Sequence, residues 1–557
     1  MIDVQDLKLL ENELQQLLDI PIKNVKDLEE WILKESQLLK EIKEQMAKFY
    51  IDFNCYNNDH KIKEKYEFSQ EFITPMLKQF KSKLDLKFYN NPYKTELDQQ
   101  YYRQYILSRS NSIEIFNEKN ISLEINEEML INQYSTIMGE MMVNWEGEEK
   151  TLQQMSLFLM DSNRNTREKA WKLIQERRMH ANKELDNIMD QLIQIRHQIA
   201  VNSGFNNYRD YMFKKYERFD YTPDDCKTFH RAVERIVVPY KDVLEKRLKE
   251  KLEVEQLMPW DSQGIPQCDK PLQPLKDSQV LVEGCIKLLN QVDSKYGDLL
   301  SQMQRDGMLD LDSRRAKSPG GFCSYLPITG LSFIFMNFAG TYEGLTTMVH
   351  EMGHAVHNMM KKSIPIYNYQ NTPMESAELA SMSMELLTID NWNYLYPDEL
   401  EFKKVRGDHI EDIIKFIPWA MTVDKFQHWM YENPDHTAEE RNKKFKEIAL
   451  SLSHHYEDWS QYQVELENRW KAQIHIYEVP FYYIEYAIAQ LGALQVWKEY
   501  KKNPGIALEN YEKALKLGSS KPLPQVYEAA GIKFDFTEET IKELMEFLSQ
   551  QLENIQQ

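Results

Sequence analysis

The sequence predicts a mostly α-helical fold with a small β-sheet, on three observations. Apolar residues recur three and four positions apart over most of the chain, which is the period of an amphipathic helix. One segment, residues 308–340, instead shows alternation and is rich in aromatic and β-branched side chains. The chain has neither an internal repeat nor a Pro/Gly/Ser-rich linker, so we expect its elements to form a single large body.

The N-terminal part of the chain is expected to be helical, with one exception. Residues 1–50 predict two helices joined near Pro21, and residues 151–215 carry the strongest helical pattern. Residues 133–146 mix β-branched, aromatic and methionine side chains and end at residues 146–148, a sequence typical of a hairpin turn. We therefore expect a small sheet element at this point.

The second half of the chain is predicted to be helical on both sides of a loop. Helices are expected over residues 223–251 and 276–305, and again from residue 375 to the end. Residues 258–274 contain four prolines, which cannot continue a helix. This stretch is therefore expected to be a loop.

Residues 308–340 predict two strands of a small sheet, 322–326 and 332–338, with a turn at Gly330. An extended peptide that adds to a free strand edge gains main-chain hydrogen bonds whatever its side chains are. We expect strand 332–338 to receive a peptide in this way. The alternative is that both strands belong only to the core.

Composition and charge exclude several classes of protein. The chain has 557 residues and is 42% hydrophobic, enough to bury a large core. Its formal net charge of −20 argues against a nucleic acid or an anionic membrane as partner, because phosphates would be repelled. The five cysteines lie far apart without CxxC spacing, and the N-terminus has no positively charged start followed by an apolar run. We therefore expect a reduced, cytoplasmic protein without a membrane span.

Residues 341–358 contain the pattern HExxH, from His350 to His354. Residues four apart on a helix lie on the same face, so the two imidazoles can bind one Zn²⁺ ion. Glu351 projects beside the metal, where its carboxylate can take a proton from a zinc-bound water. Gly353 costs about 1 kcal/mol in a helix relative to Ala, which indicates close approach by another segment. The alternative is two ordinary helix histidines that fall four apart by chance.

A catalytic zinc site has three protein ligands and one open position, so a third ligand is expected downstream. His357 follows on the same helix but is turned partly aside, and Asp390 lies beyond a long apolar helix. The first turns of that helix carry Glu375, Glu378 and Glu385. Glu378 and Glu385 share a face, so a metal-bound Glu378 with Glu385 orienting a zinc histidine is physically reasonable.

Around these residues the sequence resembles the thimet oligopeptidase and oligoendopeptidase F family of zinc metallopeptidases, and the oligoendopeptidase F branch above all. The resemblance rests on residues 337–341, 350–357 and 378–385, with further similarity at residues 162–164, 258–261 and 320–323. It covers roughly residues 130–550. In this family a glutamate downstream of the histidines is the third zinc ligand, and the resemblance places that role at Glu378.

The resemblance also implies catalytic roles for residues 475–486. Family members place a histidine and two tyrosines across the cleft from zinc, where their donors can stabilise the oxyanion of a tetrahedral intermediate. His475, Tyr483 and Tyr486 fit this arrangement, and Tyr482 is the alternative to Tyr483. Without the resemblance, this cluster would be interpreted as aromatic side chains that pack helices together.

The resemblance implies a bowl- or clam-shaped body whose deep channel admits short unfolded peptides and excludes folded proteins. We expect residues 1–195 to form a helical region of the channel wall. Residues 196–557 are expected to form the zinc metallopeptidase region.

The expected activity is hydrolysis of internal bonds in short peptides. Zn²⁺ bound by His350, His354 and Glu378 would polarise a water and the scissile carbonyl. Glu351 would take the proton of the water and later deliver it to the leaving amine. His475 and the tyrosines would hold the oxyanion.

Two alternative functions fit the same residues. A carboxypeptidase of similar helical build would need a basic residue for the C-terminal carboxylate of its substrate, such as Arg469 or Lys471. A non-catalytic, peptide-binding helical scaffold would keep a structural metal with all four positions filled by protein. The intact Glu351 argues against the scaffold, because such a site needs no base. The sequence does not predict the oligomeric state.

Overall fold

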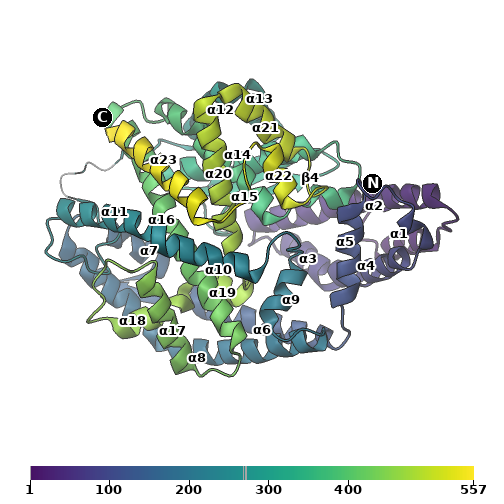
Figure 1. Cartoon of the computed structure of the whole chain (residues 1–557), viewed down its shortest axis with the longest axis horizontal. Coiled ribbons are helices and arrows are strands. Elements are labelled where there is room, and N and C mark those ends of the chain that lie inside the picture. Colours follow the sequence, from purple (N-terminus) through teal and green to yellow (C-terminus); the bar gives the residue numbers. More distant parts are fainter. Residues whose placement is uncertain (1, 267–268, 270–271, 557) are drawn as a thin grey trace.

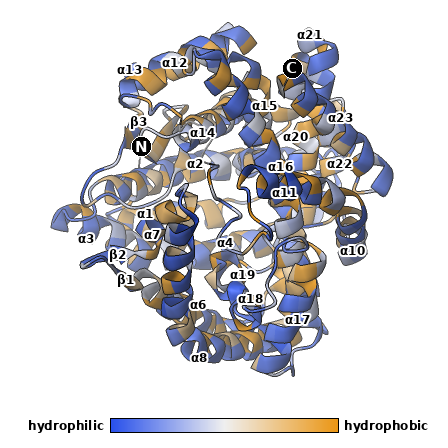
Figure 2. Cartoon of the chain, turned by 90° about the vertical axis from the view of Figure 1, so that its left-hand side faces the viewer, coloured by the Kyte–Doolittle hydropathy of each residue, from blue (hydrophilic) through white to orange (hydrophobic). Residues whose placement is uncertain are grey.

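The computed structural model describes residues 2–266, 269 and 272–556, and most of them lie in helices. Two small sheets complete the fold, so the predicted mostly α-helical class is confirmed. Helices α1, α4 and α5 lie at one end of the long axis, at the right of Figure 1, and α14, α15 and α20 lie nearer the middle. The helices carry hydrophobic residues along one side and hydrophilic residues along the other (Figure 2).

The N-terminal helices begin with the predicted pair, α1 and α2, separated by a break around Pro21. Asp6 and Asn24 cap their N-termini, since each side chain accepts a hydrogen bond from a first-turn backbone N–H. The helical elements of this region, in which η marks a short 3₁₀ or π segment, are α1 (Leu7–Asp19), α2 (Val25–Cys55), α3 (His60–Phe68), η1 (Ser69–Ile73), α4 (Thr74–Tyr89), η2 (Pro92–Thr95) and α5 (Arg103–Ile115).

The predicted hairpin is present but shorter than expected. Strands β1 (Met142–Trp145) and β2 (Glu148–Thr151) pair antiparallel around the predicted turn, where Glu146 and Gly147 both have positive φ. The prediction of a sheet element from residue 133 was wrong, because residues up to Gly139 belong to helix α6 (Asn120–Gly139). Buried side chains three and four positions apart, at residues 127, 130, 131 and 134, give that stretch a helical face.

The central helices include the longest one of the chain, α8, which confirms the strong helical pattern over residues 151–215. The elements are α7 (Leu152–Ser156), η3 (Leu157–Met160), α8 (Arg164–Asn202), α9 (Tyr208–Lys215), α10 (Pro223–Ala232), η4 (Val233–Val237), α11 (Val238–Lys251), α12 (Ser278–Val292) and α13 (Ser294–Arg305). Helix α8 runs across residue 195, and the division of the chain at that point stays a prediction.

The proline-rich stretch between α11 and α12 forms neither helix nor strand in the residues described, as predicted; Pro271 and Cys268 lie outside them. Asp261 anchors this loop, because its fully buried carboxylate accepts hydrogen bonds from Arg164 and Arg167 at 2.7 Å. Cys55, Cys226, Cys285 and Cys323 are free thiols.

The second sheet has three strands in the order β3-β5-β4. Strands β4 (Phe322–Leu326) and β5 (Leu331–Phe338) were predicted, whereas β3 (Leu309–Asp312) was not. Strand β5 pairs with β3 in parallel and with β4 antiparallel. The prediction that strand 332–338 receives a peptide was therefore wrong, because both of its edges are taken. The two edge strands of this sheet are β3 and β4.

Strand β5 leads into α14 (Tyr342–Lys361), which packs against this sheet as predicted. The remaining elements are η5 (Tyr367–Gln370), α15 (Met374–Thr388), η6 (Ile389–Tyr394), α16 (Glu399–Glu432), α17 (Ala438–Ser451), α18 (Gln463–Glu467), η7 (Arg469–Ala472), α19 (Ile474–Glu478), α20 (Ile484–Lys502), α21 (Pro504–Leu515), α22 (Leu523–Ala529) and α23 (Glu538–Gln556). Among the described residues, no helix combines the length and the apolar content that crossing a bilayer requires.

Candidate metal centre

Helices α14 and α15 bring His350, His354 and Glu378 together. The Nε2 atom of His350 lies 3.2 Å from Oε2 of Glu378, and Nε2 of His354 lies 3.7 Å from Oε1 of the same carboxylate. One ligand atom from each residue lies within 4.8 Å of the others, a spacing that suits one metal ion. Two imidazoles and a carboxylate form a donor set that suits zinc.

The close approach of the two helices depends on Gly353. A Cβ atom at this position would lie 2.5 Å from Cα of Ser381 and 2.6 Å from the carbonyl oxygen of Ala380, both backbone atoms of α15. No side chain fits there without moving one helix. The prediction of close approach at Gly353 is confirmed, and it explains how Glu378 reaches the histidines.

A second set of contacts orients two of the three residues, His350 and Glu378. Nδ1 of His350 lies 2.6 Å from Oε1 of Glu385, so a proton shared there leaves Nε2 free for a metal. The other oxygen of Glu385 lies 3.3 Å from Nε2 of His409 on α16. Ser381 donates a hydrogen bond of 2.9 Å to Oε2 of Glu378. A neighbouring side chain thus holds each of these two predicted ligands in place.

Glu351 lies beside the centre, and its Oε2 atom has no hydrogen-bond partner among the described residues. Burial raises the pKa of Glu351 to about 7, and the negative charges of Glu378 and Glu385 act in the same direction. Burial opposes ionisation of Glu378 as well. There the hydrogen bond from His350 and the nearby imidazoles prevail and lower the pKa of Glu378 to about 2.

The other three candidate ligands lie outside this group. His357 is buried, and its Nε2 atom has no hydrogen-bond partner among the described residues. Glu375 accepts a hydrogen bond of 2.7 Å from Tyr221. Asp390 forms ion pairs with Arg406 and Lys501.

The segment from His475 to Tyr486 forms an aromatic cluster. The ring of His475 lies 4.8 Å from that of Tyr483 and 6.2 Å from those of Tyr482 and Tyr486. The hydroxyls of Tyr482 and Tyr486 are 3.5 Å apart. Burial raises the pKa of both tyrosines, and the negative charge of Glu378 raises both further. The charge of the predicted ligand Glu378 thus acts on both of these hydroxyls.

Tyr483 faces other residues. Its ring lies 5.9 Å from that of Phe416, and its hydroxyl interacts with Trp419. Trp419 donates a hydrogen bond of 3.0 Å to Gln473, which in turn lies 2.6 Å from Nδ1 of His475. Of the two alternatives left open by the sequence, the geometry favours Tyr482 over Tyr483 as the hydroxyl near the centre.

A strained backbone turn sets the direction of these tyrosines. Phe481 has φ of 68°, in the left-handed region that a phenylalanine rarely adopts. Its carbonyl accepts a hydrogen bond of 2.5 Å from Arg218, and its N–H donates one of 2.9 Å to Gln427. Arg218 is also paired with Glu485 at 2.6 Å. Spacing in the sequence did not indicate the roles of Arg218 or Gln427, since both are remote from the tyrosines.

Comparison with known proteins gives two family matches. The family model described as peptidase family M3 matches residues 157–546. The model described as peptidase M3 N-terminal domain matches residues 2–116.

Curated relatives match over part of their length. The chain is 26% identical over 251 residues to an oligoendopeptidase F homolog of Borreliella burgdorferi, covering 43% of this chain and 41% of the relative. It is 23% identical over 248 residues to oligopeptidase PepF of Bacillus subtilis, covering 44% of this chain and 37% of the relative. The matched stretches thus span less than half of these relatives.

Solved structures match over nearly the whole chain. PZ peptidase A with inhibitor 2 superposes with a TM-score of 0.90 at 25% identity, covering 100% of this chain and 98% of that one. Oligoendopeptidase-F from Enterococcus faecium superposes with a TM-score of 0.67 at 16% identity, covering 99% and 98%. At this identity the second likeness shows the fold alone.

Proposed function

Because the chain belongs to peptidase family M3, we propose that it is a zinc-dependent oligoendopeptidase that hydrolyses internal bonds of short, unfolded peptides. The observation that carries the proposal is the convergence of His350, His354 and Glu378 beside Glu351, whose Oε2 atom has no hydrogen-bond partner in the described part of the chain. The names of the relatives, oligoendopeptidase F and oligopeptidase, support peptides as substrates. The cytoplasmic location and the deep channel stay part of this proposal.

Zinc fits the donor set on α14 and α15. The side chains of His350 and His354 are 24% and 20% exposed, so a metal held by them keeps an open side. Three protein ligands and an open position are typical of a catalytic rather than a structural zinc. Zinc bound there would supply Lewis acidity, which acidifies the attacking water and polarises the scissile carbonyl.

Glu351 is the general base in this proposal. Its unpartnered oxygen can take the proton of the attacking water and then deliver that proton to the leaving nitrogen. A pKa raised by burial suits both steps, because the group must accept and release a proton near neutral pH. Glu385 assists by holding the imidazole of His350 in one orientation.

We assign the stabilisation of the oxyanion to the hydroxyls of Tyr482 and Tyr486, with His475 beside them. Hydroxyl donors already directed at the developing charge are worth about 2.7–4 kcal/mol each in comparable sites. Tyr483 would be a packing residue that supports His475, since it contacts Phe416 and Trp419.

The edge strand β4 is the site at which we place the substrate backbone. Strand β4 lies against α14, and the charge of Glu351 acts on the buried thiol of Cys323 in this strand. A peptide that pairs with the edge of β4 would run past the base with its main chain extended. Pairing through main-chain groups accepts many side chains, as a broad oligopeptidase requires.

The carboxypeptidase alternative has one candidate anchor left. Lys471 is buried in an ion pair of 2.6 Å with Asp186, so it is not available to a substrate. Arg469 lies over the rings of Trp419 and Trp459, and no carboxylate lies within ion-pair distance of it among the described residues.

The test is to map by mass spectrometry the products from a mixed peptide library, with and without a zinc chelator. The proposal expects internal cuts that the chelator abolishes. Release of C-terminal residues alone would instead support the carboxypeptidase, with Arg469→Ala as the next variant. Absence of products from the zinc-loaded protein would support the scaffold.

A further inference from the structure

A second group of metal-binding side chains lies away from the centre described above. Cys226 and His230 are four residues apart on α10, and Asp424 and His428 are four residues apart on α16. Each pair therefore presents both side chains on one helix face. All four residues are buried, with exposed fractions between 0% and 3%.

Asp424 contacts both histidines, and Cys226 lies near Asp424 and His428. Nε2 of His230 lies 2.7 Å from Oδ2 of Asp424, and Nε2 of His428 lies 3.2 Å from the same oxygen. One ligand atom each from Cys226, Asp424 and His428 lies within 4.8 Å of the others. The chain therefore carries a sulfur, a nitrogen and an oxygen donor at the spacing of a metal site.

Several polar atoms of this group have no hydrogen-bond partner among the described residues. They are Oδ1 of Asp424 and Nδ1 of His428, whereas Nε2 of His428 faces Oδ2 of Asp424 at 3.2 Å. Fully buried polar atoms are almost always hydrogen-bonded, because leaving one unpaired costs about 1–3 kcal/mol. Two such atoms in one small cluster indicate that the cluster is built for a ligand rather than for packing.

We propose that this cluster is a second zinc site, with Cys226, Asp424 and His428 as ligands. His230 positions the carboxylate, since its hydrogen bond to Oδ2 leaves Oδ1 directed at the ion. Zn²⁺ bound by one thiolate and one carboxylate has no net charge, which reduces the cost of burying the ion. Mixed sulfur, nitrogen and oxygen donors favour zinc over magnesium or calcium, which prefer oxygen alone.

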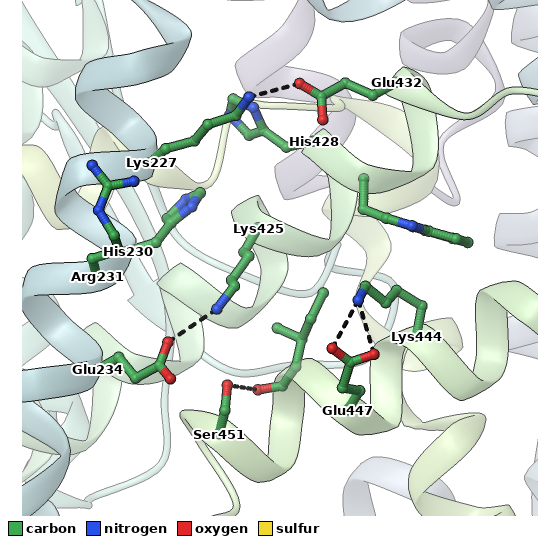
Figure 3. A pocket seen from close by; sticks show the side chains of 12 residues that line it. Lys227, His230, Arg231, Glu234, Lys425, His428, Glu432, Lys444, Glu447 and Ser451 are labelled. Atoms are coloured by element: carbon green, nitrogen blue, oxygen red, sulfur yellow. Dashed lines mark hydrogen bonds and ion pairs between the residues drawn. The ribbon is translucent and has the colours of Figure 1, made fainter.

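The site has a route to solvent. His230 and His428 form part of the wall of a cavity of about 380 Å³ between α10, α16 and α17 (Figure 3). The three lysines around it pair with glutamates: Lys227 with Glu432 at 2.9 Å, Lys425 with Glu234 at 3.0 Å and Lys444 with Glu447 at 2.8 Å. Arg231, which also lines the cavity, donates a hydrogen bond to Thr228. The lysines are thus held by acidic partners, and the cavity provides the path that a metal ion needs to enter.

The second ion would link two helices, and its fourth position would be left to a water molecule because the cluster supplies three protein ligands. The ion would join α10 to α16 next to the turn that carries the tyrosines. The ring of His428 packs 5.4 Å from that of Phe481, and Gln427 accepts the hydrogen bond from the N–H of Phe481. Fixing His428 therefore stabilises the strained backbone from which Tyr482 projects.

The experiment counts metal and detects sulfur ligation separately. Wild type, His354→Ala, Cys226→Ser and the double variant are stripped with a chelator, reconstituted with zinc, desalted and assayed for zinc per chain. We expect two equivalents in wild type, one in each single variant and none in the double variant. The matched control is Cys285→Ser, a buried thiol on α12 outside the cluster, which should keep two.

Cobalt replaces zinc in a second measurement. Cobalt-loaded His354→Ala should show the near-ultraviolet charge-transfer band of a thiolate ligand, which the group His350, His354 and Glu378 cannot produce. The band should be lost in the double variant. Far-ultraviolet circular dichroism checks the fold of every variant, and the cobalt spectrum of His354→Ala decides the question even if Cys226→Ser does not fold.

Two results would overturn the second site. The first is that His354→Ala binds no zinc and shows no thiolate band. The second is that the thiolate band persists when Cys226 is replaced by Ser. Failure of the proposed function would give a different result. If the first centre held no zinc, the zinc content would be unaffected by His354→Ala but would still fall in Cys226→Ser.

Discussion

The chain has two groups of metal-binding residues that are built alike and placed differently. Each uses a pair of side chains four apart on one helix, His350 with His354 on α14 and Asp424 with His428 on α16. Each receives its third donor from a facing helix. The histidines of the first group are about one-fifth exposed, whereas those of the second are buried.

The difference lies in what surrounds each group. In the proposed function, the first offers the carboxylate of Glu351 as a base and the hydroxyls of Tyr482 and Tyr486 as oxyanion donors. The second has a thiol and a strained turn, and its residues are buried beside the cavity between α10, α16 and α17. If both proposals hold, the same helical spacing would serve reaction in one place and rigidity in the other, depending on exposure and on the neighbouring groups.

The largest effect is expected from removing the base at the exposed group. Glu351→Gln should lower kcat by about 10²–10⁴-fold, because the amide cannot accept the proton of the water. Zinc content should stay at the wild-type value, since Glu351 is not a ligand. Turnover of a fluorogenic oligopeptide measures the rate, and Glu343→Gln on the exposed first turn of α14 is the control. A wild-type rate in Glu351→Gln would remove Glu351 from the mechanism.

The next largest effect is a loss of kcat that should differ among the three tyrosines. Tyr482→Phe and Tyr486→Phe should each lower kcat by about 10²–10³-fold, because each loses one donor to the oxyanion. Tyr483→Phe should leave kcat within a small factor of wild type. All three variants should bind zinc normally, and kcat is compared with KM for each. A large loss in Tyr483→Phe alone would restore the assignment that the sequence favoured.

A smaller effect is expected from replacing the residues that orient the ligands of the two groups. Glu385→Gln should weaken zinc at the exposed group by about 10–100-fold and leave the cobalt–thiolate band unchanged. His230→Gln should weaken metal at the buried group by a similar factor and leave zinc at the exposed group intact. Competition with a chromophoric chelator measures both affinities. If either variant lowered the metal affinity of both groups equally, the two groups would not be independent.

The smallest effect is on stability and concerns the helix contact behind the exposed group. Gly353→Ala should lower the free energy of unfolding by about 1–3 kcal/mol, because its Cβ would overlap the backbone of α15. Gly407→Ala on α16 is the control, since no atom lies within 4 Å of a Cβ there. That change should raise stability by up to about 1 kcal/mol. Urea unfolding measures both, and an equal effect of the two variants would mean that α14 and α15 need no close contact.

Much of the exposed group could be predicted because it depends on local geometry. The spacing of His350 and His354 is fixed by the helix itself, and a glycine inside a buried helix indicated a close neighbour. Glu378 was placed by family resemblance, and Glu385 followed from sharing its helix face. The fold class was predictable for the same reason, since helical periodicity is a local property of the sequence.

The parts that could not be predicted depend on contacts between remote segments. Strand β5 has the pattern of an available strand, and only the pairing with β3 shows that its edges are taken. The choice between Tyr482 and Tyr483 depends on the positive φ of Phe481, which spacing does not reveal. The buried group requires residues 194 positions apart, His230 and Asp424, to meet.

Helix α16 touches both groups, because His409 contacts Glu385 and Asp424 belongs to the buried cluster. About 22 Å of helix separates His409 from Asp424, at 1.5 Å of rise per residue. Enzymes in which two metals act on one substrate hold the ions about 3.5–4 Å apart. Two ions here would therefore form two mononuclear centres and not one dinuclear centre. Any influence of one ion on the affinity for the other would have to be mutual and of equal size.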